Sequence, residues 1–342
     1  MARRWLFPFA LNLALLLLAL LWSLLWGPVA IPPRELLAVL VRPWWPHLAQ
    51  EVPRHYITIV WDVRLPRAVL MALVGMALGG SGAAFQGLFR NPLADPYLLG
   101  VASGAGLGAV LAFSLAWPAH LAGMYRVPAM AFLAALGTVA LVYVLARSAT
   151  GIVSSTSLLL AGLAVSATAS ALMSYLMLRA EGELRRALGY LLGGAPLLGW
   201  EPILAMLPYW TVGLLGLIVA GHALNVLQFG EEQAHNLGLD VAKVRLGIIA
   251  AASLSTAAAV AFGGIIGFIG LMVPHAVRLL WGADYRRVVP LSILLGGTSL
   301  VMFDWVARMA LRPRVLPVGV VTSLVGGPFF LWVLRHHRPG VQ

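Results

Sequence analysis

Ten long apolar runs recur along the 342 residues of this chain, and they constrain its fold more than any other feature. A helix needs about 20 apolar residues to cross the hydrocarbon core of a bilayer, and no hydrophilic block here is long enough for a soluble domain. The sequence therefore predicts one all-α polytopic membrane domain over residues 1–342, in which the short eighth run tilts or stays partly embedded. The runs cover residues 5–26, 66–86, 97–117, 127–146, 157–178, 203–221, 246–263, 264–280, 290–310 and 318–334.

Composition also indicates a membrane protein. Hydrophobic residues make up 61% of the chain, charged residues 10%, and the mean hydropathy is +0.91. Soluble domains carry roughly 25% charged residues, so most of this surface does not face water. We attribute the formal net charge of +11 to contacts with membrane lipid and protein partners rather than with nucleic acid.

Charge alone does not orient the chain in the membrane. An even number of spans puts both termini on one side, which we take as the cytoplasm. The basic residues then divide 11 inside to 12 outside, so the positive-inside rule does not test this orientation. The outer segments are rich in arginine, which predicts an acidic partner on that face. These arginines include Arg64, Arg67, Arg308, Arg312 and Arg314.

Motifs for ATP binding, metal binding and catalysis are missing from the sequence. A P-loop needs Gly-x4-Gly-Lys-Ser/Thr, and the only lysine, Lys243, lies in no such context. The segment 103–108 imitates a dinucleotide-binding fingerprint but falls inside an apolar run, where small residues serve helix packing. We therefore expect no catalytic residue, no metal ligand and no cofactor in this chain, and no enzymatic activity of its own.

Asp304 is the main ionisable residue inside an apolar run, and two interpretations are open. Intramembrane acids are typical of ion-coupled carriers, so an alternative function is secondary transport with Asp304 as its relay. Arg308 follows four residues later on the same helical face, and the favoured interpretation is an i,i+4 ion pair near a helix end.

The hydrophilic segment at about 228–243 is predicted to contain a short amphipathic helix. Glu231 and Glu232 come in its first turn, where acids favour the helix dipole, and Gly238 follows where the helix should stop. Ala234 lies between them. A surface helix with no partner is the alternative.

A weak internal repeat is also visible. The pattern of glycines and proline at 79–92 recurs with slightly shorter spacing at 263–274, and Val-Arg-Leu precedes both copies. Five spans separate the copies, so the second would be inverted in the membrane, a common plan in transporters.

Seven motifs, in this order and spacing over residues 58–335, together resemble one known family. They are RLPR at 64–67, RNPLADP at 90–96, STSLLLAG at 155–162, Gly-Glu…Ala…Leu-Gly at 230–238, GFIGLMVPHAVRLL at 267–280, Asp304 with Ala307-Arg308, and LPVGVVTSLVGGPFFLWVL at 316–334. The chain resembles the FecCD/BtuC-like permeases, the transmembrane subunits of ABC importers for iron-siderophores, haem or cobalamin.

The resemblance implies a type II ABC importer permease fold in a bacterial inner membrane. It implies a homodimer of permeases, two ATP-binding cassette subunits that bind ATP and Mg, and an extracytoplasmic substrate-binding protein. The cargo would be a metal chelate, with ferric siderophore as first choice and cobalamin or haem next.

The resemblance also implies roles for individual residues. Docking of the binding protein falls to Arg64, Arg67 and Arg308, for which snorkelling to the interface is the alternative. The cytoplasmic gate would be formed by Asn91, Leu93, Thr156 and Ser157, and helix capping is a second interpretation of Thr156 and Ser157. Coupling to the ATPase falls to Glu231, Glu232, Ala234 and Gly238. The 42–55 loop and Arg312-Pro313-Arg314 depart from the family pattern.

Overall fold

The computed structural model describes residues 2–49, 52–115, 125–147, 154–179, 183–194 and 199–336, and its regular elements within these residues are helices. Seven described helices are long and apolar enough to cross a membrane. They are α1 (Ala2–Leu25), α4 (Leu65–Leu88), α7 (Arg126–Ala146), α8 (Ser155–Arg179), α10 (Glu201–Val219), α13 (Val241–Gly263) and α15 (Tyr285–Met309). Three shorter apolar helices are α5 (Val101–Ser114), α14 (Ile269–Trp281) and α16 (Val318–His336). The predicted set of about ten apolar helices is confirmed.

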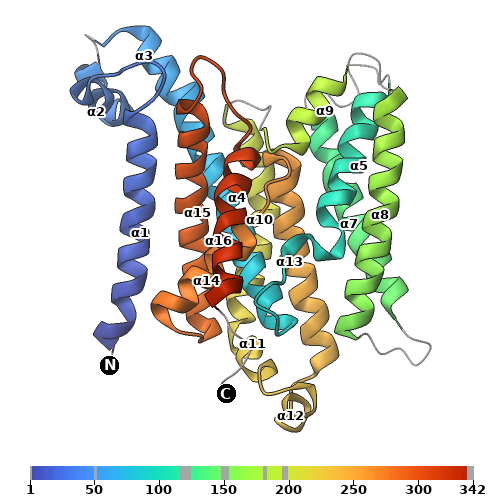
Figure 1. The fold of residues 1–342 in the computed structure, drawn as a ribbon. Coiled ribbons are helices and arrows are strands. Elements are labelled where there is room, and N and C mark those ends of the chain that lie inside the picture. The colour runs from blue at the N-terminus through green and yellow to red at the C-terminus, as the bar shows by residue number, and fades with distance from the viewer. Residues whose placement is uncertain are drawn as a thin grey trace.

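Short helices cover the two ends of this bundle. At one end α12 projects, and α1 begins and α16 ends toward the same side (Figure 1). We call this the α12 end, and the opposite end, which carries α2, α3 and α9, the α2 end. The short elements are α2 (Pro33–Val41), a 3-10 turn (Pro46–Ala49), α3 (Arg54–Thr58), a π-helix (Ile59–Arg64), a 3-10 turn (Pro96–Leu99), α9 (Leu184–Leu191), α11 (Gly221–Leu227) and α12 (Glu231–Asn236).

Helix α4 is the core of the bundle because its glycines admit neighbouring backbones. A Cβ at Gly75 would overlap the carbonyl oxygen of Gly296 on α15, and one at Gly82 would overlap that of Gly270 on α14. The most apolar window of the segment that includes α4 is 89% buried, whereas the corresponding window of α8 is 17% buried. Small residues at these crossings replace side-chain packing with close backbone approach, as is usual between membrane helices.

Two of the helices are shorter than the apolar runs that predicted them. The third run begins with the 3-10 turn Pro96–Leu99, and Gly100 at φ 81° separates that turn from α5. The eighth begins with extended chain, and Phe268 at φ 70° precedes α14, which has 13 residues. The short eighth span agrees with expectation, whereas the break inside the third was not predicted, because Gly100 lies within an apolar, small-residue run.

The two copies of the suggested repeat run in opposite directions. Helix α4 begins at the α2 end, whereas α13 begins next to α12 (Figure 1). This is the arrangement that an inverted repeat requires. The duplication itself stays a prediction.

Candidate functional site

The three arginines predicted to dock a partner lie together at the α2 end. Arg64 closes the π-helix, Arg67 follows in the first turn of α4, and Arg308 lies in the last turn of α15. The short π-helical stretch continues directly into α4, so Arg64 and Arg67 are held on one rigid element. The close α4–α15 packing then brings Arg308 beside them.

Asp304 joins two of these arginines in a buried ion-pair cluster. Arg67 donates from Nη2 at 2.8 Å and from Nε at 3.0 Å to Asp304 Oδ1, and Arg308 donates from Nε to Oδ2 at 2.9 Å. The Asp304 side chain is 1% exposed and that of Arg308 8%, whereas Arg67 retains 22%. The predicted i,i+4 pair is confirmed, and it is one half of a bridge between α4 and α15.

Arg64 holds the loop that follows α1. Its Nη1 donates to the carbonyl of Leu24 at 2.6 Å, and its Nη2 donates to that of Val29. Arg308 Nη2 donates to Ser23 Oγ at 2.7 Å, which ties the last turn of α1 to α15. Arg64 and Arg308 are thus buried and satisfied inside the protein, and Arg67 is the member of the trio that reaches the surface.

At the α12 end, the segment predicted to form a short amphipathic helix does so. Gly230 at φ 107° precedes α12 and Gly238 at φ 85° follows it, both in conformations that favour glycine. Ala234 is fully buried and anchors the helix, while Glu232 faces solvent. Glu231 accepts from Arg245 Nη2 on α13, so this acid is paired within the chain.

Asn225 and Gln228, on α11 and just after it, connect this region to two long helices, and sequence reasoning missed both. Asn225 Nδ2 donates to Asp284 Oδ1 at 2.7 Å, and its Oδ1 accepts from the Tyr285 backbone N–H at 2.8 Å at the start of α15. Gln228 Nε2 donates to the carbonyl of Gly87 at 2.9 Å near the end of α4. The sequence did contain a signal for these contacts, namely two amide side chains three residues apart in an otherwise apolar stretch.

Asp284 caps α15 outside the membrane-spanning helix. Its Oδ1 accepts from the Arg286 backbone N–H at 3.0 Å, and Arg286 Nη2 donates to Oδ2 at 2.9 Å. The hydrogen-bonded Arg286 guanidinium lowers the pKa of Asp284 to about 2. The carboxylate is therefore ionised at neutral pH, where it also holds Asn225.

The predicted gate residues occupy two neighbouring elements. Asn91 Oδ1 accepts from the Leu93 backbone N–H at 2.9 Å in the turn after α4, and the Leu93 side chain is 41% exposed. Thr156 and Ser157 lie in the first turn of α8, where Ser154, not either of them, accepts the capping bond from Ser157 N–H at 3.0 Å. Ser157 Oγ accepts from the Ser154 hydroxyl at 2.9 Å, so Ser157 takes part in the cap that Ser154 forms, and capping by Thr156 stays a prediction.

The two gate elements touch through the 3-10 turn Pro96–Leu99. A Cβ at Gly162 on α8 would overlap the carbonyl oxygen of Leu98 in that turn. Helix α8 therefore packs against the chain that follows Asn91 and Leu93, and the gating role of the four residues stays a prediction. Among the described residues, no group of three or more His, Cys, Asp or Glu side chains lies close enough to hold a metal ion.

Together, these features define a helical membrane protein with a short projecting helix at one end and a buried arginine cluster at the other. The sequence profile of the FecCD transport family matches residues 15–336, and the chain belongs to this family of ABC transporter permeases. It has no catalytic function of its own, and the ion-coupled carrier hypothesis for Asp304 is replaced by this assignment.

Two relatives and one solved structure illustrate the similarity of this chain to known permeases. The chain is 45% identical to the cobalamin import permease BtuC of Halobacterium salinarum, over 83% of this chain and 75% of the relative. It is 39% identical to the hemin transport permease HmuU of Yersinia pestis, over 82% and 84%. An inward-facing structure of a metal-chelate type ABC transporter superposes with a TM-score of 0.82 at 29% identity, covering 96% and 98%. The type II importer fold is thereby confirmed.

Proposed function

We propose that this permease imports a bulky metal chelate using ATP that partner subunits bind and hydrolyse with Mg. The observation that carries the proposal is α12, a short helix that projects from the bundle (Figure 1) and ion-pairs with α13, and that directly follows the amides bonded to α15 and α4. Family membership and the match to an inward-facing metal-chelate transporter support it. This chain supplies the path and the partners supply the energy.

The similar permeases narrow the range of candidate substrates. The family resemblance made ferric siderophore the first choice, but two similar permeases are named for cobalamin and hemin. Both are metal complexes of tetrapyrrole-type macrocycles, with four ring nitrogens around the metal. We therefore place a tetrapyrrole-type chelate ahead of a ferric siderophore as the substrate class.

Helix α12 is suited to transmit movement from an ATPase. Phe229 and Leu237 flank it with 67% and 69% exposure, and a shallow surface pocket between them reaches Gln233 and Asn236. Apolar side chains this exposed at an aqueous end favour a protein partner. Because Gln228 bonds to Gly87 on α4, displacement of α12 would reach the turn that carries Asn91.

Arg67 is the residue we propose to meet a carboxylate of the binding protein. Its partly exposed guanidinium is oriented by Asp304, and charge-assisted bonds to a second carboxylate would use its remaining donors. Arg64 and Arg308 act through position, because their donors already serve α1 and Asp304. This divides the roles that the family resemblance assigned equally to the three arginines.

The assembly follows from the same arrangement. ATP is available in the cytoplasm, so the α12 end, toward which α1 begins and α16 ends, faces inward in the bacterial cell membrane. Helix α8, with 17% of its most apolar window buried, leaves a long face for a second permease copy. We propose a homodimer with two ATPase subunits.

The proposed coupling surface is tested by replacing Phe229 and Leu237 with serine together. The full-length permease should stay folded but lose co-purification with its ATPase, because the exposed apolar contacts are gone. Leu37→Ser on α2, where the leucine is 60% exposed, is the control and should retain the ATPase. Full recovery of the ATPase by the double variant would overturn the coupling role.

Docking is tested separately with Arg67→Gln, which leaves the Asp304–Arg308 pair in place. Binding-protein capture should fall while ATPase co-purification is unchanged. Arg54→Gln, at an exposed position of α3 on the same end, should have little effect. Equal capture by Arg67→Gln and the parent protein would count against Arg67.

A further inference from the structure

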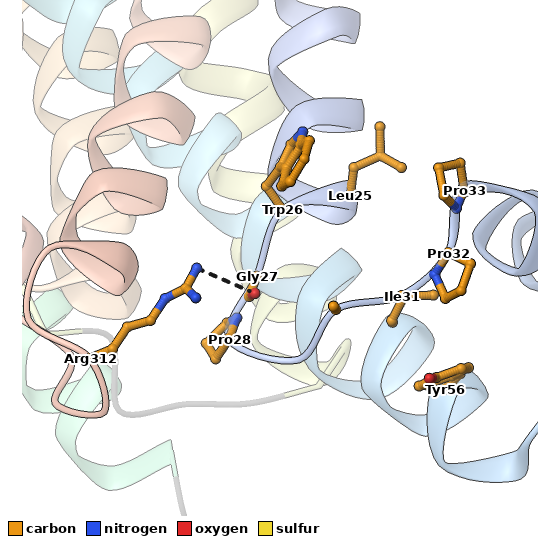
Figure 2. A pocket seen from close by; sticks show the side chains of 10 residues that line it. Leu25, Trp26, Gly27, Pro28, Ile31, Pro32, Pro33, Tyr56 and Arg312 are labelled. Carbon is orange, nitrogen blue, oxygen red and sulfur yellow. Dashed lines mark hydrogen bonds between the residues drawn. The ribbon is translucent and has the colours of Figure 1, made fainter.

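A cavity of about 520 Å³ opens at the α2 end of α1, beside the loop that Arg64 holds, and Arg64 itself does not line it. Its walls come from the 25–33 stretch between α1 and α2, Tyr56 of α3, and Arg312 in the connection between α15 and α16 (Figure 2). The loop is held in place from behind, because Trp305 Nε1 donates to the Trp26 carbonyl at 2.9 Å. The loop that lines the cavity is therefore fixed by a hydrogen bond to α15.

The cavity has one cationic end and one apolar end. Arg312 reaches toward Gly27, whose carbonyl accepts from Nη2 at 3.5 Å, and its other contact is the Met309 sulfur (Figure 2). A guanidinium has five N–H donors, so most of those of this exposed side chain stay available. Ile31 and Tyr56 line the other side. Such a site fits an amphiphile with an anionic head.

Leu25 and Trp26, at the end of α1 and just after it, line the cavity, and exposed apolar side chains of α1 lead up to them. Leu18 and Trp22 are 61% and 43% exposed on the helix that leads into the cavity. The Trp22 ring lies 5.8 Å from that of Trp26 and 5.7 Å from that of Trp305. Aromatic clusters of this kind sit at the headgroup level of a bilayer, which places Arg312 at the depth of lipid phosphates.

We propose that this cavity binds the headgroup of an anionic phospholipid of the outer leaflet. The phosphate contacts Arg312, and an acyl chain lies along the exposed face of α1 past Trp22. A carboxylate from a partner protein would satisfy Arg312 equally well but would leave the apolar continuation along α1 unused. The bound lipid would fasten α1, the helix at the edge of the bundle, to the α15–α16 connection.

The test is native mass spectrometry of the full-length permease titrated with phosphatidylglycerol or with phosphatidylcholine of the same chains. We expect tighter retention of phosphatidylglycerol, and a loss of about tenfold in its affinity in Arg312→Gln, the size expected for one charge-assisted contact. Arg314→Gln is the matched control, because Arg314 is exposed two residues away but does not line the cavity. Ala30→Trp fills the cavity while keeping Arg312, and should also lose the lipid.

Other outcomes would overturn the proposal. Equal losses in Arg312→Gln and Arg314→Gln would show general attraction to a basic surface, and equal retention of the two lipids would show no headgroup recognition. Displacement of the lipid by millimolar inorganic phosphate would show a simple anion site. Loss of binding-protein capture in Arg312→Gln, with lipid retention unchanged, would assign the arginine to a protein partner.

Discussion

Substitution of Asp304 by asparagine tests the buried cluster that joins α4 to α15. The change keeps the shape of the side chain but removes the charge that faces Arg67 and Arg308. Breaking a buried ion pair costs about 3–5 kcal/mol, and the Arg308 side chain is 8% exposed. Arg67 adds little, since a partly hydrated pair contributes about 1 kcal/mol or less. The asparagine oxygen can still accept one bond, so we expect a loss of about 3 kcal/mol, the low end of the range.

The loss is measured by thermal unfolding of the purified permease in detergent, followed by the fluorescence of its 12 tryptophans. It corresponds to a fall in Tm of about 6 °C. Asp62→Asn is the control, because Asp62 is an exposed acid at the same end, and it should change stability by about 0.5 kcal/mol or less. In Asp304→Asn/Arg308→Gln the two losses should be less than additive, because the unpaired cation is gone. Equal Tm values for Asp304→Asn and Asp62→Asn would refute the reasoning.

Three further predictions follow from the packing and from the α12 end. Gly75→Ala should lose about 1–3 kcal/mol of stability through overpacking against the α15 backbone. Gly137→Ala is the control and should lose none, because no atom lies within 4 Å of the added Cβ. Equal effects of the two substitutions in thermal unfolding would contradict close packing. Arg286 lowers the pKa of Asp284 to about 2, below its ordinary 3.8. The pair therefore stabilises the fold fully above pH 3.8, and its contribution is lost as the pH falls from 3.8 to about 2. Asp284→Asn should therefore remove that part of the acid dependence of unfolding, and an unchanged pH profile would count against it. Gln228→Ala should leave ATP hydrolysis in place but lower uptake per ATP, and an unchanged ratio would exclude the link to α4.

Apolar run length predicted the helices because a spanning segment must satisfy its own backbone hydrogen bonds. It failed where the chain departs from helix without a change in composition. Gly100 and Phe268 both have positive φ and interrupt apolar stretches. Glycine and phenylalanine both occur inside membrane helices, so the positive φ of Gly100 and Phe268 follows from tertiary packing and not from local sequence.

The site could be predicted only where its contacts are local. Asp304 and Arg308 are four residues apart, and their pairing was readable from the helical period. Arg67 lies 237 residues from Asp304, and no local pattern reports such a contact. Arg64 binds two backbone carbonyls, a kind of acceptor that every residue offers, so its burial could not be foreseen.

The central claim is that this permease moves its cargo with ATP supplied by partner subunits. The direct test is uptake of cobalamin, haem and a ferric siderophore by proteoliposomes that contain the permease, its ATPase and its binding protein. The account predicts uptake that requires ATP and the ATPase and that persists when ionophores collapse all ion gradients. Uptake by the permease alone, driven by an ion gradient and abolished by an ionophore, would contradict it.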